Sequence, residues 1–229
     1  MLTPFGANLW LADGADPVSV AGFRYATRMA VIRLADGGLL IWSPIALTPA
    51  LRDAVTALGE VRFLAAPNTL HHLFLEGWQR AFPRAALHAA PGLDRKRRDL
   101  SIAATLSETP PAAWTADIDQ AVFVTAITTE TVFFHRPSST VLFTDLIQHF
   151  PQGWFTGWRA AVARLDLMVA PAPSVPRKFR LAITRRSAAR ATLARILAWP
   201  SERLVFAHGA PVETGGRQVI ADAFAWLGS

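Results

Sequence analysis

Short, strongly apolar segments alternate with helix-like segments through the first half of the chain. Apolar runs bounded by turn residues predict buried strands, whereas apolar residues spaced three and four apart predict helices. The predicted strands are Asn8–Ala12, Met29–Leu34, Leu39–Trp42, Val61–Ala65 and Ala85–Ala89. Thr48 and Pro49 can begin a helix that ends at Gly59, and Asn68 or Thr69 can cap a second helix. This alternation predicts sequential crossovers within one sheet.

After about residue 100 the pattern changes to extended segments followed by helices. The predicted strands are Asp119–Ala126, Glu130–His135, Thr140–Thr144 and Arg203–Ala207, and the predicted helices are Trp154–Arg164, Ser187–Ala198 and Gly216–Leu227. Two such halves facing each other would place two sheets inside and helices outside. We therefore expect an α/β fold in which residues 1–229 form a single domain.

Composition bears on where the protein is located and on which residues can hold a metal. Apolar residues make up 52% of the chain, yet no uncharged run approaches the ~20 residues that would span a bilayer. The segment from Met1 to Gly6 lacks a basic stretch followed by an apolar one, so we expect no secretion signal and, by default, a cytoplasmic location. The chain contains no cysteine. Any metal must therefore be held by histidine, aspartate or glutamate, and a cysteine nucleophile is excluded.

Arginine supplies nearly all the positive charge of a chain whose formal net charge is +6. The densest run, Arg95-Lys96-Arg97-Arg98, follows Pro91-Gly92 in a connection. A solvated loop is the first interpretation of this run, a site for an anionic small molecule the second, and nucleic acid a distant third. We expect a small-molecule substrate, with an anionic one left open, and no membrane partner. The oligomeric state has no signature in the sequence.

Polar residues follow three predicted strands, at positions where α/β folds commonly bind ligands. His71 and His72 stand where a helix N-terminus would disfavour imidazolium and keep both rings able to bind a metal. Asp145 follows an apolar strand, and a partly buried carboxylate must be paired, hydrogen-bonded or bound to a cation. His208 precedes Gly209, which permits a tight turn. Capping and packing roles are the structural alternatives for all of these side chains.

The order and separation of these residues resemble the metallo-β-lactamase fold superfamily. There, a His-x-His-x-Asp-His motif follows a strand, a bridging Asp follows a later strand, and a His-Gly pair closes the site. Aligning His71-His72 with the end of the first motif places Pro67 and Thr69 where its first two histidines belong. A further histidine of the family falls at Ala126–Thr129, where none occurs. The resemblance implies a four-layer αββα sandwich with a degenerate motif.

The resemblance also implies a reduced metal site. The ion that the superfamily holds with three histidines would have none of them here. The other ion would keep His72, Asp145 and His208, with His71 replacing a carboxylate as a fourth ligand or serving as a base. The implied cofactor is one divalent metal, zinc ahead of iron or manganese, or no metal at all. His135, at the end of a predicted strand, is a further candidate for the same rim.

Two functions of different classes follow from these residues. The first is a metal-dependent hydrolase with a mononuclear site and an undefined substrate, in which His71 and Asp145 act catalytically. The second is a non-catalytic protein of the same fold that has lost its metal and binds a small ligand or a protein partner.

Overall fold

Two sheets of unequal size face each other in the computed structural model, which describes residues 1–228. The larger sheet has the strand order β1-β2-β5-β6-β7-β8-β9 and the smaller one β10-β11-β12-β13. The strands of the larger sheet are β1 (Thr3–Gly6), β2 (Leu9–Asp13), β5 (Arg28–Arg33), β6 (Leu39–Trp42), β7 (Val61–Ala66), β8 (Ala86–Ala89) and β9 (Ile102–Thr105). Those of the smaller sheet are β10 (Ile118–Val124), β11 (Thr129–His135), β12 (Thr140–His149) and β13 (Arg203–Gly209). Strands β3 (Val18–Val20) and β4 (Phe23–Tyr25) pair separately as a hairpin.

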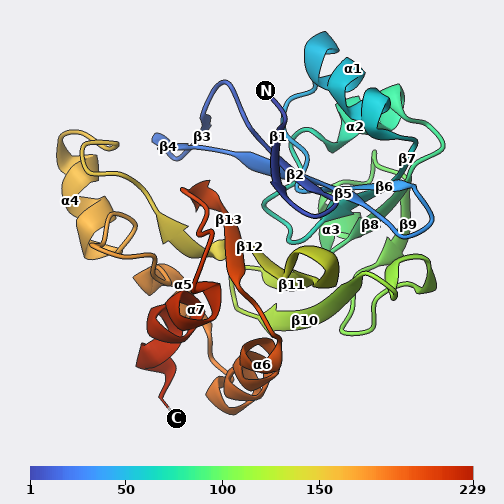
Figure 1. The fold of residues 1–229 in the computed structure, drawn as a ribbon. Coiled ribbons are helices and arrows are strands. Elements are labelled where there is room, and N and C mark those ends of the chain that lie inside the picture. The colour runs from blue at the N-terminus through green and yellow to red at the C-terminus, as the bar shows by residue number, and fades with distance from the viewer. Residues whose placement is uncertain (229) are drawn as a thin grey trace.

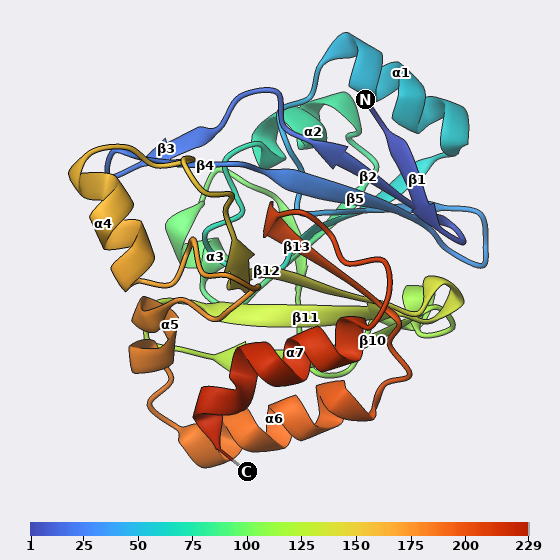
Figure 2. The same ribbon diagram turned by 60° about the vertical axis from the view of Figure 1, so that its left-hand side comes forward.

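Helices cover the outer faces of both sheets (Figures 1 and 2). The larger sheet carries α1 (Pro49–Leu58), α2 (Leu75–Ala81) and α3 (Leu93–Lys96). The smaller one carries α5 (Arg177–Ala182), α6 (Arg186–Ala198) and α7 (Gly216–Phe224). Helix α4 (Trp158–Leu165) lies at one end of the molecule, beside the β3–β4 hairpin (Figure 2). Short 3₁₀ turns span Ala112–Trp114, Arg136–Ser138 and Ala225–Leu227.

Alternating strand residues build three apolar layers between these elements. In β12, Val141 and Phe143 pack toward the helices of their own sheet. Leu142, between them, belongs with Trp42 and Phe133 to the apolar layer that joins the two sheets. A third layer lies between the larger sheet and α1–α3. This alternation produces the four-layer αββα sandwich that the sequence predicts.

The predicted crossovers of the first half are confirmed. Strands β6, β7, β8 and β9 are parallel neighbours, and α1, α2 and α3 connect them. Helix α1 begins after Thr48, whose hydroxyl accepts a hydrogen bond from the Leu51 N–H, and it ends before Gly59, as predicted. None of the helices within residues 1–228 has the length and apolarity needed to cross a bilayer.

The second predicted helix begins later than the sequence indicates. Helix α2 starts at Leu75, because the Asn68 side chain caps a turn instead of a helix. Its Oδ1 accepts hydrogen bonds from the N–H groups of Leu70 and His71, at 2.8 and 3.0 Å. The segment before α2 is therefore irregular. Strand β12 also differs from its prediction, since it continues past Thr144 to His149 through an irregular stretch.

Candidate metal centre

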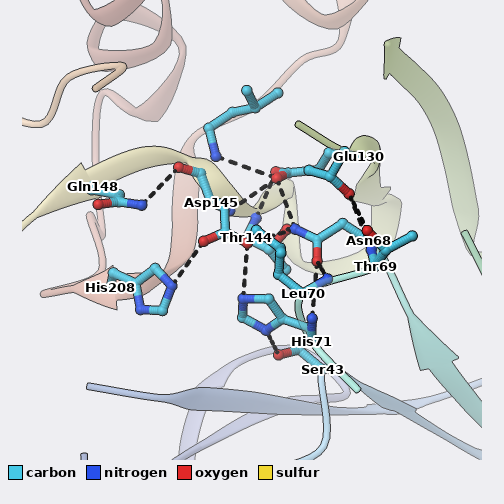
Figure 3. Close-up of polar contacts among 12 residues, drawn as sticks. Ser43, Asn68, Thr69, Leu70, His71, Glu130, Thr144, Asp145, Gln148 and His208 are labelled. Atoms are coloured by element: carbon cyan, nitrogen blue, oxygen red, sulfur yellow. Dashed lines mark hydrogen bonds and ion pairs between the residues drawn. The ribbon is translucent and has the colours of Figure 1, made fainter. Parts of the chain in front are cut away.

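Three of the predicted ligands converge on one point between the two sheets (Figure 3). His71 Nε2 lies 3.2 Å from Asp145 Oδ2, and His208 Nε2 lies 3.1 Å from Asp145 Oδ1. One ligand atom from each residue lies within 4.8 Å of the other two. No other group of three or more His, Asp or Glu residues with this spacing occurs within residues 1–228. The structure therefore brings together three of the predicted residues, which come from β12, β13 and the segment after β7.

The tautomer of His208 is set by the chain before β5. Its Nδ1 lies 2.6 Å from the backbone oxygen of Ala26. A carbonyl oxygen can only accept, so Nδ1 carries a hydrogen and a neutral ring keeps its lone pair on Nε2. The ring is buried and stacks on Phe150 with a centroid distance of 5.8 Å. His208 thus presents an Nε2 lone pair to Asp145 from a fixed position.

The His71 ring is fixed in the same way through a serine. The Ser43 hydroxyl donates its hydrogen to the backbone oxygen of Arg28 at 3.1 Å. It must therefore accept the hydrogen of His71 Nδ1, which lies 2.7 Å away. A neutral His71 then also directs its Nε2 lone pair at the Asp145 carboxylate.

These contacts show that the residues fit a divalent metal ion. Two Nε2 lone pairs and a carboxylate are all acceptors, so with neutral rings no hydrogen lies among them and a cation is needed to join them. Tetrahedral bonds of ~2.0–2.1 Å to nitrogen or oxygen place neighbouring ligand atoms about 3.3 Å apart. The observed separations of 3.1 and 3.2 Å, each to a different oxygen of Asp145, lie close to this spacing and also to that of ordinary hydrogen bonds. Bound histidines usually donate their other ring N–H to a protein acceptor, and both histidines do so here.

Asp145 is held as a carboxylate within this cluster. Burial by itself would raise the pKa of Asp145, but protonated His71 and His208 rings, which donate to its carboxylate when no ion is bound, hold that pKa well below its ordinary value. The Asn68 side-chain amide also donates to Asp145 Oδ2 at 2.6 Å. Asn68 therefore serves both the turn that carries His71 and the carboxylate opposite it.

Glu130, which the sequence analysis does not single out, shapes the backbone around Asp145. Phe143 pairs with Phe206, and the next pair is Gln148 with His208. The four residues 144–147 of β12 therefore face the single residue Ala207 of β13 and form a bulge. The Glu130 carboxylate accepts the N–H groups of Thr144, Asp145 and Leu146 in this bulge, at 2.7, 2.9 and 3.3 Å. Burial and the neighbouring charge of Asp145 raise the pKa of Glu130. The side chain thus replaces sheet partners that the bulge lacks.

Arg28 is a second residue whose role the sequence conceals. Its guanidinium pairs with Asp13 and donates to the backbone oxygens of Phe206, at 3.0 Å, and Gly209. These two carbonyls flank His208. The backbone oxygen of Arg28 also accepts from Ser43, the partner of His71. One buried residue of β5 therefore supports both histidines of the cluster.

His72 lies outside the cluster, although the sequence analysis places it among the ligands. Arg97 Nη1 donates to His72 Nδ1 at 3.1 Å and to the His72 backbone oxygen at 2.9 Å. Burial, followed by the charges of Lys96, Arg97 and His71, lowers the pKa of His72 to about 4. The Asn68 turn explains the outcome, because it directs one of the two adjacent rings inward and the other toward α3. The arginine run is thus more than a solvated loop, since Arg97 holds His72.

His135 is also remote from the cluster. It is fully buried near the start of β12, where its Nδ1 lies 2.7 Å from the Ser138 hydroxyl. Strand β11 runs from Glu130, beside Asp145, to His135 at its other end. His135, a further candidate from the sequence, therefore does not reach the rim of this site.

The fold defines the class. The chain has the metallo-β-lactamase fold, as several solved structures of low sequence identity show. The metallo-β-lactamase from Pontibacter korlensis aligns with a TM-score of 0.62 at 8% identity, over 99% of this chain and 98% of its own. The mono-zinc form of the metallo-β-lactamase FIM-1 from Pseudomonas aeruginosa aligns with a TM-score of 0.61 at 13% identity, over 99% of this chain and 93% of its own. The Flv1 flavodiiron core from Synechocystis aligns with a TM-score of 0.65 at 12% identity, over 99% of this chain and 60% of its own.

Within this class, the chain belongs to the family described as a domain of unknown function, DUF4336, whose model matches residues 9–153. No curated protein matches the chain by sequence. The match ends before His208, so one member of the cluster lies beyond the segment that defines the family.

Proposed function

We propose that this protein is a metal-dependent hydrolase with a single divalent ion held by His71, Asp145 and His208. The proposal is carried by one observation: both imidazoles aim Nε2 at the same carboxylate while hydrogen-bonding through Nδ1 to Ala26 and Ser43. Two imidazoles and one carboxylate form a common zinc set that also suits iron and manganese. We further propose that residues 1–229 act as one domain.

The residues around Thr69 support a mononuclear site. In the degenerate motif proposed for this chain, Pro67, Thr69 and a residue near Thr128 stand in place of three histidines. The Thr69 and Thr128 hydroxyls lie 2.9 Å apart, and the Thr69 N–H donates to the Thr128 hydroxyl at 3.1 Å. These groups satisfy one another, and Pro67 offers no side-chain ligand. A second ion would therefore find no imidazole there.

The position of His72 supports a catalytic role for the site. Four protein ligands would fill a tetrahedral shell, which is typical of structural zinc, whereas catalytic sites keep three and leave one position open. With His72 bound to Arg97, three ligands remain. All three line a cavity of about 420 Å³, which a substrate can enter. An ion bound there would supply Lewis-acid chemistry toward a carbonyl or phosphoryl oxygen.

His71 and Asp145 are the proposed catalytic residues. Asp145 stays ionised because its pKa is low, and Asn68 holds one of its oxygens in place. His71 has no hydrogen on Nε2 when its ring is neutral, since Ser43 binds the Nδ1 hydrogen. In a role as base, His71 would leave the ion to Asp145 and His208, and its Nε2 could then accept a proton at the floor of the cavity, while Asp145 keeps its negative charge toward the ion.

Metal analysis of untagged protein tests this function, with His71→Ala, Asp145→Ala and His208→Ala as site variants. His72→Ala is the matched control, because it removes an adjacent imidazole that lies outside the cluster. We expect about one ion per chain in wild type and His72→Ala, and loss of the ion in the three site variants. Negligible metal in wild type, or equal metal in all variants, would contradict the proposal.

A metal-free binding protein is the second candidate, and the hydrogen bonds of Asp145 favour it. If both rings are protonated, Asp145 is satisfied by His71, His208 and Asn68 without any ion. Thermal unfolding with and without a chelator separates the two functions. A tightly bound ion makes the midpoint depend on the chelator, because it stabilises only the folded state, whereas a metal-free protein unfolds at the same temperature in both conditions.

A further inference from the structure

The cavity in front of the cluster has chemistry of its own. Its volume of about 420 Å³ falls within the ~300–1,000 Å³ of small-molecule pockets. Most of its wall is apolar and comes from elements far apart in the chain. The apolar lining includes Val18, Val20, Leu70, Leu73, Ile127 and Phe179. Such a wall favours a ligand with an apolar body over a fully polar one.

Four apolar side chains of this lining are exposed at the rim of the cavity. The exposed fractions are 56% for Val20, 38% for Leu70, 51% for Leu73 and 44% for Ile127. They belong to β3, to the turn before α2 and to the turn between β10 and β11. Grouped exposed apolar residues around a cavity mark a binding groove rather than the ordinary scatter of surface side chains.

The charged residues of the cavity wall are few, and most of them are lysines. The chain has two lysines, Lys96 and Lys178, and 21 arginines. Both lysines line the cavity and none of the arginines does, while Asp145 is the only acidic residue of the described lining. Lys96 Nζ donates to the Thr69 backbone oxygen at 2.8 Å and has no carboxylate partner within residues 1–228. Lys178 pairs with Asp166 at 3.1 Å. A lysine ammonium acts as a compact, mobile point charge rather than as a planar two-pronged donor.

We infer that the cavity binds an amphiphilic anion, a small molecule with an apolar chain or ring system and one carboxylate or phosphate group. The apolar part would lie against Leu70, Leu73 and Ile127, and Lys96 and Lys178 would neutralise the charge. That this ligand is the substrate rests on the proposed function, whereas its binding does not require a metal.

A series of straight-chain carboxylates tests the apolar part. Hexanoate, octanoate and decanoate are titrated into the protein below their micelle concentrations, with calorimetric detection. Burying a methylene is worth ~0.8 kcal/mol, which corresponds to about fourfold in Kd. We expect Kd to fall about fourfold per added methylene until the cavity is full. A Kd that does not change with chain length overturns the inference.

Charge and its source are tested at fixed chain length. Decanol and decyltrimethylammonium should bind more weakly than decanoate, and decyl phosphate compared with decanoate identifies the preferred anion. Lys96→Met and Lys178→Met should each weaken the binding of decanoate about 1.4- to fivefold, as expected for a largely exposed ion pair worth ~0.2–1 kcal/mol. Arg98→Met is the control, since it removes the same charge from the Lys96 segment outside the cavity. Equal affinity for decanoate and decanol, or no effect of either lysine variant, overturns the anionic part.

A rim variant and metal removal complete the design. Leu73→Asp should abolish the chain-length dependence, whereas Leu165→Asp, a similarly exposed leucine outside the lining, should leave it intact. Equal effects of the two substitutions would refute binding at this rim. All titrations are repeated after chelation. If the amphiphile still binds after chelation, the inference about the cavity holds even where the protein proves to contain no metal. If the metal content is as proposed but no amphiphile binds, only this inference is overturned.

Discussion

Replacing Arg28 tests whether its guanidinium positions His208, since the backbone oxygen that holds Ser43 and His71 stays in place. Arg28→Met keeps the apolar stem but removes the guanidinium that pairs with Asp13 and donates to the Phe206 and Gly209 carbonyls. Hydrogen bonds that involve a charged group contribute ~1.5–3 kcal/mol each, and the Arg28 guanidinium makes two of them to backbone carbonyls, whereas its ion pair with the exposed Asp13 adds little. We therefore expect the free energy of unfolding to fall by about 3–5 kcal/mol.

The same substitution should weaken metal binding. Residues that orient metal ligands through hydrogen bonds typically contribute 10–100-fold to affinity. We expect a loss of that size in a competition titration with a chromophoric chelator, at a temperature where the variant is folded. Arg33→Met is the control, because Arg33 lies in the same strand and its guanidinium donates to a single carbonyl, that of Leu58. If Arg28→Met loses stability but binds metal within twofold of the control, the positioning role is refuted.

Three further substitutions have defined outcomes. Glu130→Gln should lower the free energy of unfolding by ~2–3 kcal/mol in urea titrations, because an amide cannot accept all the N–H groups of the β12 bulge. Gly209→Ala should weaken metal binding, since a Cβ there would lie 2.5 Å from the His149 backbone oxygen at a φ of +150°; unchanged affinity would show that the turn can adjust. Burial lowers the pKa of His135 from 6.5 to about 4, so the unfolded chain binds the extra proton and stability falls as pH drops from 6.5 to 4. His135→Gln should remove up to ~3 kcal/mol of that dependence, and parallel curves for wild type and variant would contradict it.

Local patterns in the sequence were sufficient for most of the fold. Leu39–Trp42 and the helix from Pro49 to Leu58 match their predictions to the residue, because apolar periodicity, an N-cap and a terminal glycine all act within a few residues. The β3–β4 hairpin and the short helices α3 and α5 were missed. They are three to six residues long, too short for a periodic pattern to distinguish them from loops.

The site was only partly predictable, because its support comes from distant contacts. Asp145 and His208 could be identified as polar residues that interrupt or end apolar strands. Arg28, by contrast, reaches a carbonyl 178 residues away, and no local pattern marks such a contact. The choice between His71 and His72 depends on the Asn68 side chain, which caps a turn where the sequence allows a helix.

The cluster joins two sheets that each fix their own part of it. On the larger sheet, Ser43 follows β6 and orients His71, and the Arg28 backbone that holds Ser43 belongs to β5. On the smaller sheet, Glu130 of β11 holds the bulge of β12 that carries Asp145. Movement of one sheet relative to the other would therefore separate His71 from Asp145 directly. A metal at this junction would link the two sheets in addition to its proposed catalytic role. Substitutions that loosen the packing between the sheets should therefore also lower the affinity for the ion.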